Sequence, residues 1–158
     1  MLNNPYNSTS IFSDFEITPA SESDMPWILE VEQEEFSPPW THGSLLSEIY
    51  NCDTFFAIAR SDNHNLGFII MRSVVDTGEL LQIVVKKNVR RQGIADELLG
   101  AMFEHARSNK VTSIFLEVRK SNEAAISFYN KHHFRLVRIR KDYYTAPTED
   151  AVEMSRGV

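Results

Sequence analysis

The sequence predicts a single α/β domain in which helices flank a central mixed sheet. At 158 residues the chain is long enough to bury one full core. Short β-type runs and amphipathic helical segments follow one another along it without an internal repeat. In the middle, the order strand, helix, strand between Leu80 and Val118 is the pattern of a right-handed crossover with parallel strands. We expect the domain to span residues 14–158 and residues 1–13 to be a flexible N-terminal extension.

Capping and turn residues divide the first half of the chain into four strands and two helices. Pro26 falls in the first turn of the first helix, where its missing N–H costs nothing. The run Ser37–Trp40, which contains two prolines, ends that helix. The expected order is a strand at 15–17, a helix capped by Ser23 or Asp24, a helix that opens at Thr41 or Ser44 and reaches about Tyr50, and strands at 54–60, 66–75 and up to Val85.

The second half contains two helices with a strand between them. Ile94, Leu98, Met102 and Phe103 form one apolar stripe on the first of these helices, which begins after Gly93. The remaining elements are expected as a strand at 112–118, a helix from 123 to about 132, and strands at 134–140 and 151–154 on either side of an irregular, tyrosine-bearing loop.

Composition excludes several classes of protein. No window approaches the ~18 consecutive apolar residues that a membrane span requires, and residues 1–13 lack the pattern of a secretory signal. Cys52 is the single cysteine, so no intramolecular disulfide can form, and a cytoplasmic location is expected. The five histidines show no metal-ligand spacing, so no metal is expected. Nucleic acid is not expected as the main ligand, because basic residues are few and no aromatic side chains accompany them.

The net charge of −6 is unevenly distributed along the chain. Residues 1–59 contain ten acidic residues and no Lys or Arg, whereas residues 60–158 contain twelve acidic and sixteen basic residues. Glu32 falls on the inward face of the first helix, with Glu30, Glu34 and Glu35 nearby. This division predicts two ligands of opposite charge, of which the acidic part attracts a cationic one. A solvated acidic helix that only aids solubility explains the same pattern equally well.

The junction between the strand Leu80–Val85 and the following helix predicts a phosphate site. A helix start leaves backbone N–H groups unpaired, and the helix dipole adds positive charge there. Gly93 and Ala95 are small enough for a phosphate to approach the main chain. The spacing fits neither a P-loop nor a dinucleotide-binding fingerprint. Four basic residues lie around the junction, namely Lys86, Lys87, Arg90 and Arg91.

Two residues further along have the chemistry of a proton acceptor and a proton donor. Glu117 ends an apolar row near the carboxyl end of the strand at 112–118, where ligands gather in open α/β sheets. Partial burial would raise its pKa toward that of a useful general base. Tyr129 lies in the next helix, and its phenol suits protonation of a thiolate. A solvated strand-end glutamate and a core tyrosine are the competing interpretations.

The motif Arg90-Arg91-Gln92-Gly93-Ile94-Ala95 resembles the acyl-CoA-binding signature of the GCN5-related N-acetyltransferases (GNAT), Gln/Arg-x-x-Gly-x-Gly/Ala. The run from Leu116 to Tyr129 resembles one branch of that family, the RimI-type ribosomal-protein alanine N-acetyltransferases. Pro39-Trp40 and the tail Tyr143-Tyr144…Glu149-Asp150-Ala151…Met154 are similar to elements of the same branch. The resemblance covers residues 15–154. It implies the GNAT acyltransferase fold, acetyl-CoA as co-substrate without a metal, and a basic protein N-terminus as partner, with the N-terminal alanine of small-subunit ribosomal protein 18 as the expected acceptor.

The resemblance also implies roles for the residues of the junction. The main chain of the strand residues Ile83, Val84 and Val85 holds the acetyl group and the pantetheine arm. The following helix start cradles the pyrophosphate with Arg91, Gln92, Gly93, Ile94, Ala95 and Asp96. Asn122, at the start of the next helix, contacts CoA.

On the acceptor side the resemblance implies that Glu117 is the base and Tyr129 the acid that reprotonates the CoA thiolate. We expect Glu32, Trp40 and Tyr143 to contact the substrate. The rival interpretations are acetylation of another amine, such as a lysine side chain, a polyamine or an aminoglycoside, and a catalytically silent module that binds CoA.

Three positions depart from the family pattern. Ala95 replaces the second glycine, which the family tolerates. Asp96 places a carboxylate beside the expected pyrophosphate, where it should weaken binding. His133 stands where relatives have a glycine before the phenylalanine, so we expect a histidine with positive φ, at an energetic cost.

Overall fold

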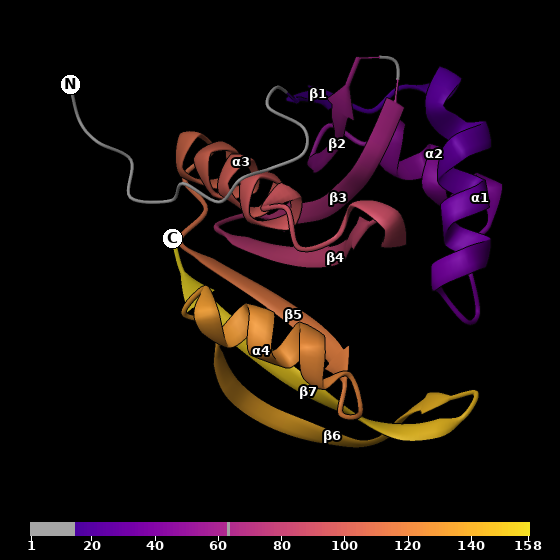
Figure 1. The fold of residues 1–158 in the computed structure, drawn as a ribbon. Coiled ribbons are helices and arrows are strands. Elements are labelled where there is room, and N and C mark those ends of the chain that lie inside the picture. Colours follow the sequence, from indigo (N-terminus) through magenta and orange to yellow (C-terminus); the bar gives the residue numbers. More distant parts are fainter. Residues whose placement is uncertain (1–14, 63) are drawn as a thin grey trace.

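A seven-stranded sheet with helices on both faces forms the centre of the computed structural model, which describes residues 15–62 and 64–158 (Figure 1). The strand order is β1-β2-β3-β4-β5-β7-β6, and β4 and β5 are the one parallel pair among these neighbours. The predicted mixed sheet and its parallel crossover are therefore confirmed. The predicted N-terminal extension lies outside the described residues. In chain order the elements are β1 (Glu16–Pro19), α1 (Met25–Glu35), α2 (His42–Tyr50), β2 (Thr54–Ser61), β3 (His64–Val74), β4 (Thr77–Val85), α3 (Ile94–Ser108), β5 (Ser113–Arg119), α4 (Glu123–Lys131), β6 (Arg135–Thr145) and β7 (Thr148–Gly157), with short 3-10 helices at Glu22–Asp24 and Lys87–Val89.

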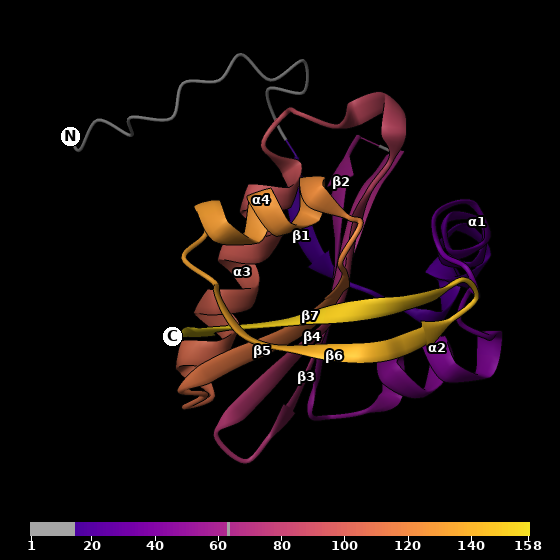
Figure 2. The ribbon, with the colours of Figure 1, turned by 90° about the horizontal axis from the view of Figure 1, so that it is seen from below.

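The helices divide between the two faces of the sheet. α1 and α2 lie on one side, and α3 and α4 lie on the other (Figure 2). A large apolar cluster under α3 and α4 includes Leu98, Leu116 and Phe134, and a smaller one under α1 and α2 includes Ile28 and Phe68. Within the described segments, no helix is both long and apolar enough to span a membrane.

Side chains at the helix starts explain where the helices begin. The hydroxyl oxygen of Thr41 accepts a hydrogen bond from the Ser44 N–H at 3.1 Å and caps α2. The amide oxygen of Asn122 accepts one from the Ala125 N–H at 3.1 Å and caps α4. Each bond satisfies one of the N–H groups that a helix start leaves unpaired. Pro26 lies in the first turn of α1, as predicted.

The C-terminal hairpin is longer than the sequence predicts. The tyrosine-bearing segment is not an irregular loop but continues β6 as far as Thr145. The register of β6 on β7 shifts between Leu136 and Arg138 and again between Arg140 and Tyr144. Each such irregularity interrupts the alternation of inward and outward side chains by which a strand is recognised in a sequence. The prediction of two short strands was wrong for this reason.

Candidate active site

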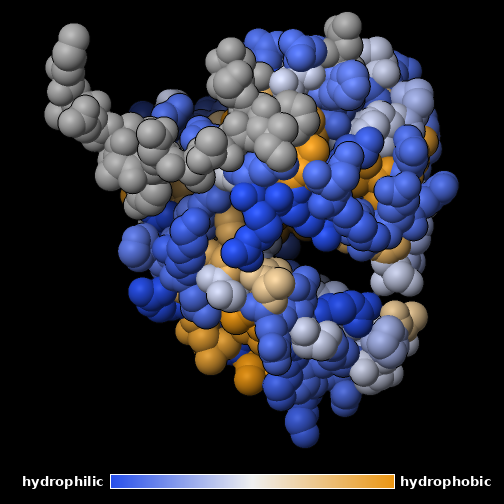
Figure 3. Space-filling model, viewed as in Figure 1, coloured by the Kyte–Doolittle hydropathy of each residue, from blue (hydrophilic) through white to orange (hydrophobic). Residues whose placement is uncertain are grey.

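The parallel strands β4 and β5 separate halfway along their length. They pair only from Thr77–Leu80 of β4 to Ser113–Leu116 of β5. On β3, Met71 faces Leu80 and Ile70 faces Gln82, so Leu81 is an extra, bulged residue at the point of separation. The remainder of β4 continues to Val85 without a strand partner on its β5 side. The surface is hollowed between the upper and lower parts of the molecule, on the side where the strands diverge (Figure 3).

The start of α3 lies at one end of this opening. Gly93 precedes the helix with a left-handed φ of +82°, and a Cβ built on it meets no other atom within 4 Å. The first hydrogen bond of the helix runs from the Glu97 N–H to the Gly93 carbonyl, at 3.1 Å. The N–H groups of Ile94, Ala95 and Asp96 precede it, in the positions that no helical carbonyl reaches. Glycine, open space and free donors together suit an anionic group.

Two of the four basic residues expected around this helix start have other partners. Arg90 donates to the carboxylate of Glu35 on α1 and to the Val85 carbonyl, both at 2.8 Å. Lys87 lies 3.6 Å from the same carboxylate. These contacts fasten α1 to the end of β4 and partly neutralise two of the four positive charges expected around the helix start. Among the described residues, Lys86 and Arg91 form no ion pair, which leaves their charge for a ligand.

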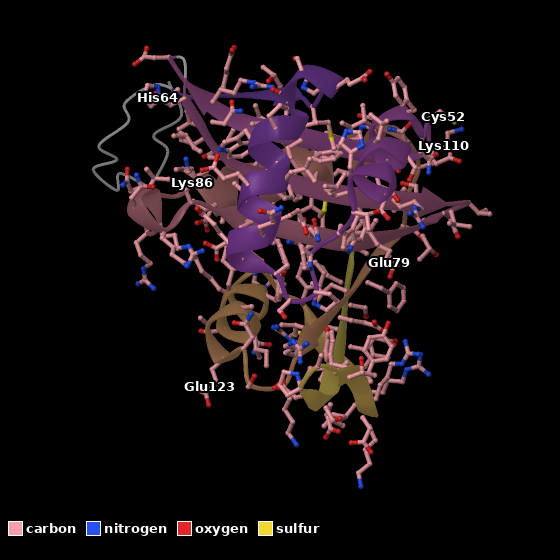
Figure 4. The ribbon with its side chains drawn as sticks, turned by 90° about the vertical axis from the view of Figure 1, so that its right-hand side faces the viewer. Cys52, His64, Glu79, Lys86, Lys110 and Glu123 are labelled. Atoms are coloured by element: carbon pink, nitrogen blue, oxygen red, sulfur yellow. The ribbon has the colours of Figure 1, made fainter. Side chains whose placement is uncertain are left out.

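Residues from both parts of the split sheet face the same side of the molecule. Figure 4 shows Lys86, which follows β4, and Glu123, which begins α4, on one side of the ribbon. Asn122, the cap of α4, directly precedes Glu123. The starts of α3 and α4 are therefore placed to meet one extended ligand from two elements.

Asp96 does not present an unmatched negative charge at the start of α3. Its Oδ1 lies 2.7 Å from Lys131 Nζ and 2.9 Å from His132 Nε2, both at the end of α4. Burial alone would raise the pKa of Asp96, but Lys131 and His132 outweigh it and hold that pKa below its ordinary value. Burial lowers the pKa of His132, so Lys131 supplies the matching charge near neutral pH. This ion pair joins α3 to α4.

Glu117 lies at the end of β5 with a cation beside it. Its neighbours Leu116 and Val118 point into the core under α3 and α4, so Glu117 faces the other side of the sheet. The guanidinium of Arg140 on β6 donates to its carboxylate. The Glu117 side chain is 18% exposed and lines a cavity of about 250 Å³. The sequence did not reveal Arg140 as the partner, because the bulges in β6 hide the register that brings the two residues together.

Tyr129 is buried between α4 and the sheet. Its ring packs edge-on against Phe134 and Phe128, with centroids 5.6 and 5.5 Å away. Burial raises the pKa of its phenol well above the ordinary value, and nearby Tyr144 raises it further. Tyr144 also interacts electrostatically with Glu117. Tyr129 therefore keeps its proton at neutral pH.

Two arginine–tyrosine pairs line the side of the opening formed by the hairpin. The guanidinium carbons of Arg140 and Arg119 each lie 4.2 Å from a ring centroid, the first over Tyr143 and the second over Tyr144. Arg119 also donates to the Ser37 carbonyl in the α1–α2 loop at 3.4 Å. Arg119, the last residue of β5, donates to the Ala146 and Pro147 carbonyls of the hairpin turn as well, so it links the hairpin to the α1–α2 loop. The Tyr-Tyr pair was visible in the sequence, but nothing in the pattern identified its arginine partners.

Glu32 does not present its charge to the surface. It is 0% exposed, and one carboxylate oxygen accepts a hydrogen bond from the Trp40 N–H at 2.9 Å. Burial raises the pKa of Glu32, partly offset by that bond and by the side chain of Gln82. Trp40 is half-buried against the smaller apolar cluster, while Glu30 and Glu34 are exposed. The described residues contain no group of three or more His, Cys, Asp and Glu side chains that could hold a metal ion.

Comparisons with known proteins agree with this geometry. Residues 25–134 match the model of the acetyltransferase (GNAT) family. The chain is 30% identical over 142 residues to the [ribosomal protein bS18]-alanine N-acetyltransferase of Escherichia coli, covering 88% of this chain and 95% of that protein. It is also 30% identical over 156 residues to an N-alpha-acetyltransferase of Saccharolobus solfataricus, covering 90% and 93%.

Solved structures show the same likeness. The crystal structure of the Escherichia coli ribosomal-protein-S18-alanine N-acetyltransferase superposes with a TM-score of 0.83 at 28% identity, covering 92% of this chain and 94% of that one. The family match spans more than half of the sequence, and the site has the helix start after Gly93 that the motif predicted. The chain therefore belongs to the acetyltransferase (GNAT) family.

Proposed function

We propose that this protein transfers the acetyl group of acetyl-CoA to the α-amine of a protein N-terminus, and that the N-terminal alanine of small-subunit ribosomal protein 18 is its acceptor. The observation that supports the proposal most directly is the separation of β4 and β5, because the free edge of β4 and the start of α3 belong to one part of the sheet while Glu117 and Tyr129 belong to the other. The names of the relatives at 30% identity support the choice of acceptor.

The residues around the opening fit acetyl-CoA. The helix start from Arg91 to Asp96 binds the pyrophosphate through its free N–H groups, and the space beside Gly93 admits it. Ile83, Val84 and Val85 offer the unpaired edge of β4 to the pantetheine arm, and Asn122 contacts it from α4. A main-chain N–H of this strand polarises the carbonyl of the thioester. Acetyl-CoA supplies the activated acetyl group.

Two side chains carry the proton transfers. Glu117 accepts a proton from the acceptor ammonium, whose pKa of ~8 requires only a modest base near neutral pH. Arg140, beside it, orients the carboxylate. Tyr129 delivers a proton to the departing thiolate, and burial keeps that proton on the phenol until it is needed.

The acceptor peptide lies against the α1–α2 loop and the hairpin. Trp40 forms one wall, and Tyr143, which is 42% exposed, forms the other. Exposed Glu30 and Glu34 on α1 favour a basic peptide over an acidic one. Glu32 and Glu35 take no direct part in this attraction, since one is buried and the other is paired.

Mass spectrometry of the products tests the proposal. The protein is incubated with acetyl-CoA and a panel that contains an alanine-initiated basic peptide, the same peptide with a blocked α-amine and an internal lysine, and a polyamine. We expect one acetyl group on the free α-amine and none on the other two compounds. Acetylation of the blocked peptide or the polyamine would identify another amine as the acceptor, and no product at all would indicate a silent CoA-binding module.

A further inference from the structure

The buried glutamate of α1 has no counter-ion. Glu32 is fully buried, and no salt bridge to it is formed by any described residue. Burial of an ionisable group is costly, so such a group is retained where its hydrogen bonds serve a purpose. The bond from the Trp40 N–H is the first indication of that purpose, because Trp40 lies in the loop after α1, eight residues further along the chain.

A second contact joins Glu32 to β4. The side chain of Gln82, which is 7% exposed, lies close enough to lower the pKa of the Glu32 carboxyl. Glu32 Oε1 and Gln82 Oε1 are nevertheless both buried, and neither has a hydrogen-bond partner among the described residues. A Gln82 amide N–H that donates to the Glu32 carboxylate accounts for the lowering, because a hydrogen bond to the charged form favours that form.

The two partners of Glu32 belong to the two segments that border the acceptor side of the opening. Gln82 directly follows the bulged Leu81, where β4 leaves β5, and it precedes the strand residues that face the acetyl group. Trp40 lies in the α1–α2 loop, whose Ser37 carbonyl accepts a hydrogen bond from Arg119. A single side chain therefore spans the distance between the loop and the strand.

We propose that Glu32 is a positioning residue of the acceptor site, which holds the Trp40 segment against the bulged part of β4 and so sets the affinity for the acceptor peptide without contacting it. This inference rests on the proposed function, since it concerns the peptide side of that site. It differs from long-range attraction of a basic peptide, because a hydrogen-bonding role is retained by an uncharged side chain of the same shape.

The chain offers a matched control. Glu48 on α2 is also buried, at 3% exposure, and its carboxylate binds Arg72 and Thr54. None of its hydrogen-bond partners among the described residues lies in the Trp40 loop or in β4. Replacement of Glu48 thus measures the general cost of losing a buried carboxylate, while replacement of Glu34, which is exposed on α1, measures the loss of surface charge.

The kinetic test compares Glu32→Gln and Glu32→Leu with Glu48→Leu and Glu34→Gln. A hydrogen bond to a buried carboxylate is worth enough for its loss to raise the peptide KM about tenfold in Glu32→Leu. We expect the KM for acetyl-CoA to stay unchanged there, and Glu32→Gln to restore the peptide KM because the amide oxygen still accepts from Trp40. Glu48→Leu should keep the wild-type peptide KM, whereas Glu34→Gln should raise it only slightly and only for basic peptides at low salt. Equal increases in Glu32→Leu and Glu48→Leu, or equal damage in Glu32→Gln and Glu32→Leu, would overturn the proposal.

A second measurement does not depend on activity. Hydrogen exchange of the Trp40 amide, followed by NMR, should be slow in the wild type and in Glu32→Gln, and fast in Gln82→Leu and Glu32→Leu. If Glu32→Leu does not fold, Gln82→Leu provides the same comparison through the other partner. Unchanged protection of Trp40 in Gln82→Leu would refute the link to β4. Absence of peptide acetylation by the wild type would instead disprove the proposed function and leave this measurement interpretable.

Discussion

The two parts of the split sheet are built differently. The body, which comprises β1 to β4 with α1, α2 and α3, has apolar clusters on both faces, and Phe68, Ile69, Ile70 and Met71 of its strand β3 are fully buried. The arm, which comprises β5 to β7 with α4, ends in the edge strand β6. That strand is exposed along most of its length, and Leu136 is 59% exposed. Few side chains of the body are therefore available for chemistry, whereas the arm has a row of exposed side chains.

This difference indicates which groups each part contributes to substrate binding and to catalysis. Around the opening, the body contributes backbone groups: the free edge of β4 and the helix start after Gly93. The arm contributes titratable side chains, namely Glu117, Tyr129 and Tyr143. Backbone donors fixed in a rigid core suit binding, while side chains that can accept or donate a proton suit proton transfer. We infer that substitutions in the body change substrate binding and that those in the arm change turnover.

The largest effects are expected in the arm. Glu117→Gln and Tyr129→Phe should each lower kcat by ~10²–10⁴-fold, the usual loss when a general base or acid is removed. Acetyl-CoA affinity should remain near that of the wild type. Glu117→Gln should also regain activity as the pH rises, because the free amine then forms without a base. Stopped assays across pH, combined with calorimetric titration of acetyl-CoA, measure both quantities.

Glu153 provides the control for Glu117. The two residues face each other across β5 and β7, and each is paired with an arginine of β6, Glu153 with Arg138 at 2.9 Å. Glu153→Gln makes the same chemical change beside the site and should keep nearly full turnover. If it lowers kcat as much as Glu117→Gln does, the effect belongs to the charge of the hairpin and Glu117 is not the base.

The body should respond at Gly93 with a loss of binding. Gly93→Val puts a β-branched side chain on a left-handed backbone and fills the space beside the helix start. We expect acetyl-CoA affinity to fall at least about tenfold, from strain and steric exclusion together. Gly100, further along α3, also has open space around it but no positive φ, so Gly100→Val is the matched control. Wild-type affinity in a folded Gly93→Val protein would exclude this helix start as the phosphate site.

Features that depend on local sequence signals could be predicted, whereas features that depend on strand register could not. The start of α2 at Thr41, one of the two expected positions, the parallel crossover and the helix start after Gly93 all depend on local signals, and these were confirmed. The predicted hairpin was wrong because the bulges in β6 disrupt its alternation. Bulges leave no mark in composition, since their effect is on register.

At the candidate site, too, contacts between residues far apart in the sequence could not be predicted. Glu117 and Tyr129 were found from motif and position, but the Arg140 partner of Glu117 depends on long-range register. The helical spacing correctly placed Glu32 on the inward face of α1, but the absence of a counter-ion among the described residues could not be read from the sequence. Lys87 and Arg90 were assigned to a phosphate because charge is visible in a sequence, whereas their pairing with Glu35 of α1 is not.

A smaller effect is expected where body and arm meet, at Asp96 and Lys131. Lys131→Met leaves the Asp96 carboxylate without its cation beside the phosphate site, and the repulsion should weaken acetyl-CoA binding about fivefold, as expected for one partly exposed charge pair. The loss should be larger at low salt. Addition of Asp96→Asn to Lys131→Met should restore most of the affinity. If the double variant binds as weakly as Lys131→Met alone, Lys131 acts by contacting the phosphate itself.

The smallest expected effect is confined to the arm and concerns His133. This residue follows α4 with a left-handed φ of +66°, and the Phe134 N–H behind it donates to the Tyr129 carbonyl at 3.0 Å. A side chain costs about 1 kcal/mol in this conformation, and glycine avoids that cost. His133→Gly should therefore raise the Tm by about 2–4 °C for a domain of this size. His133→Ala removes the same imidazole but keeps a Cβ, so it should give no such gain. Equal Tm values for the two variants would show that the imidazole and not the backbone determines stability at this turn, and kcat should stay unchanged in both.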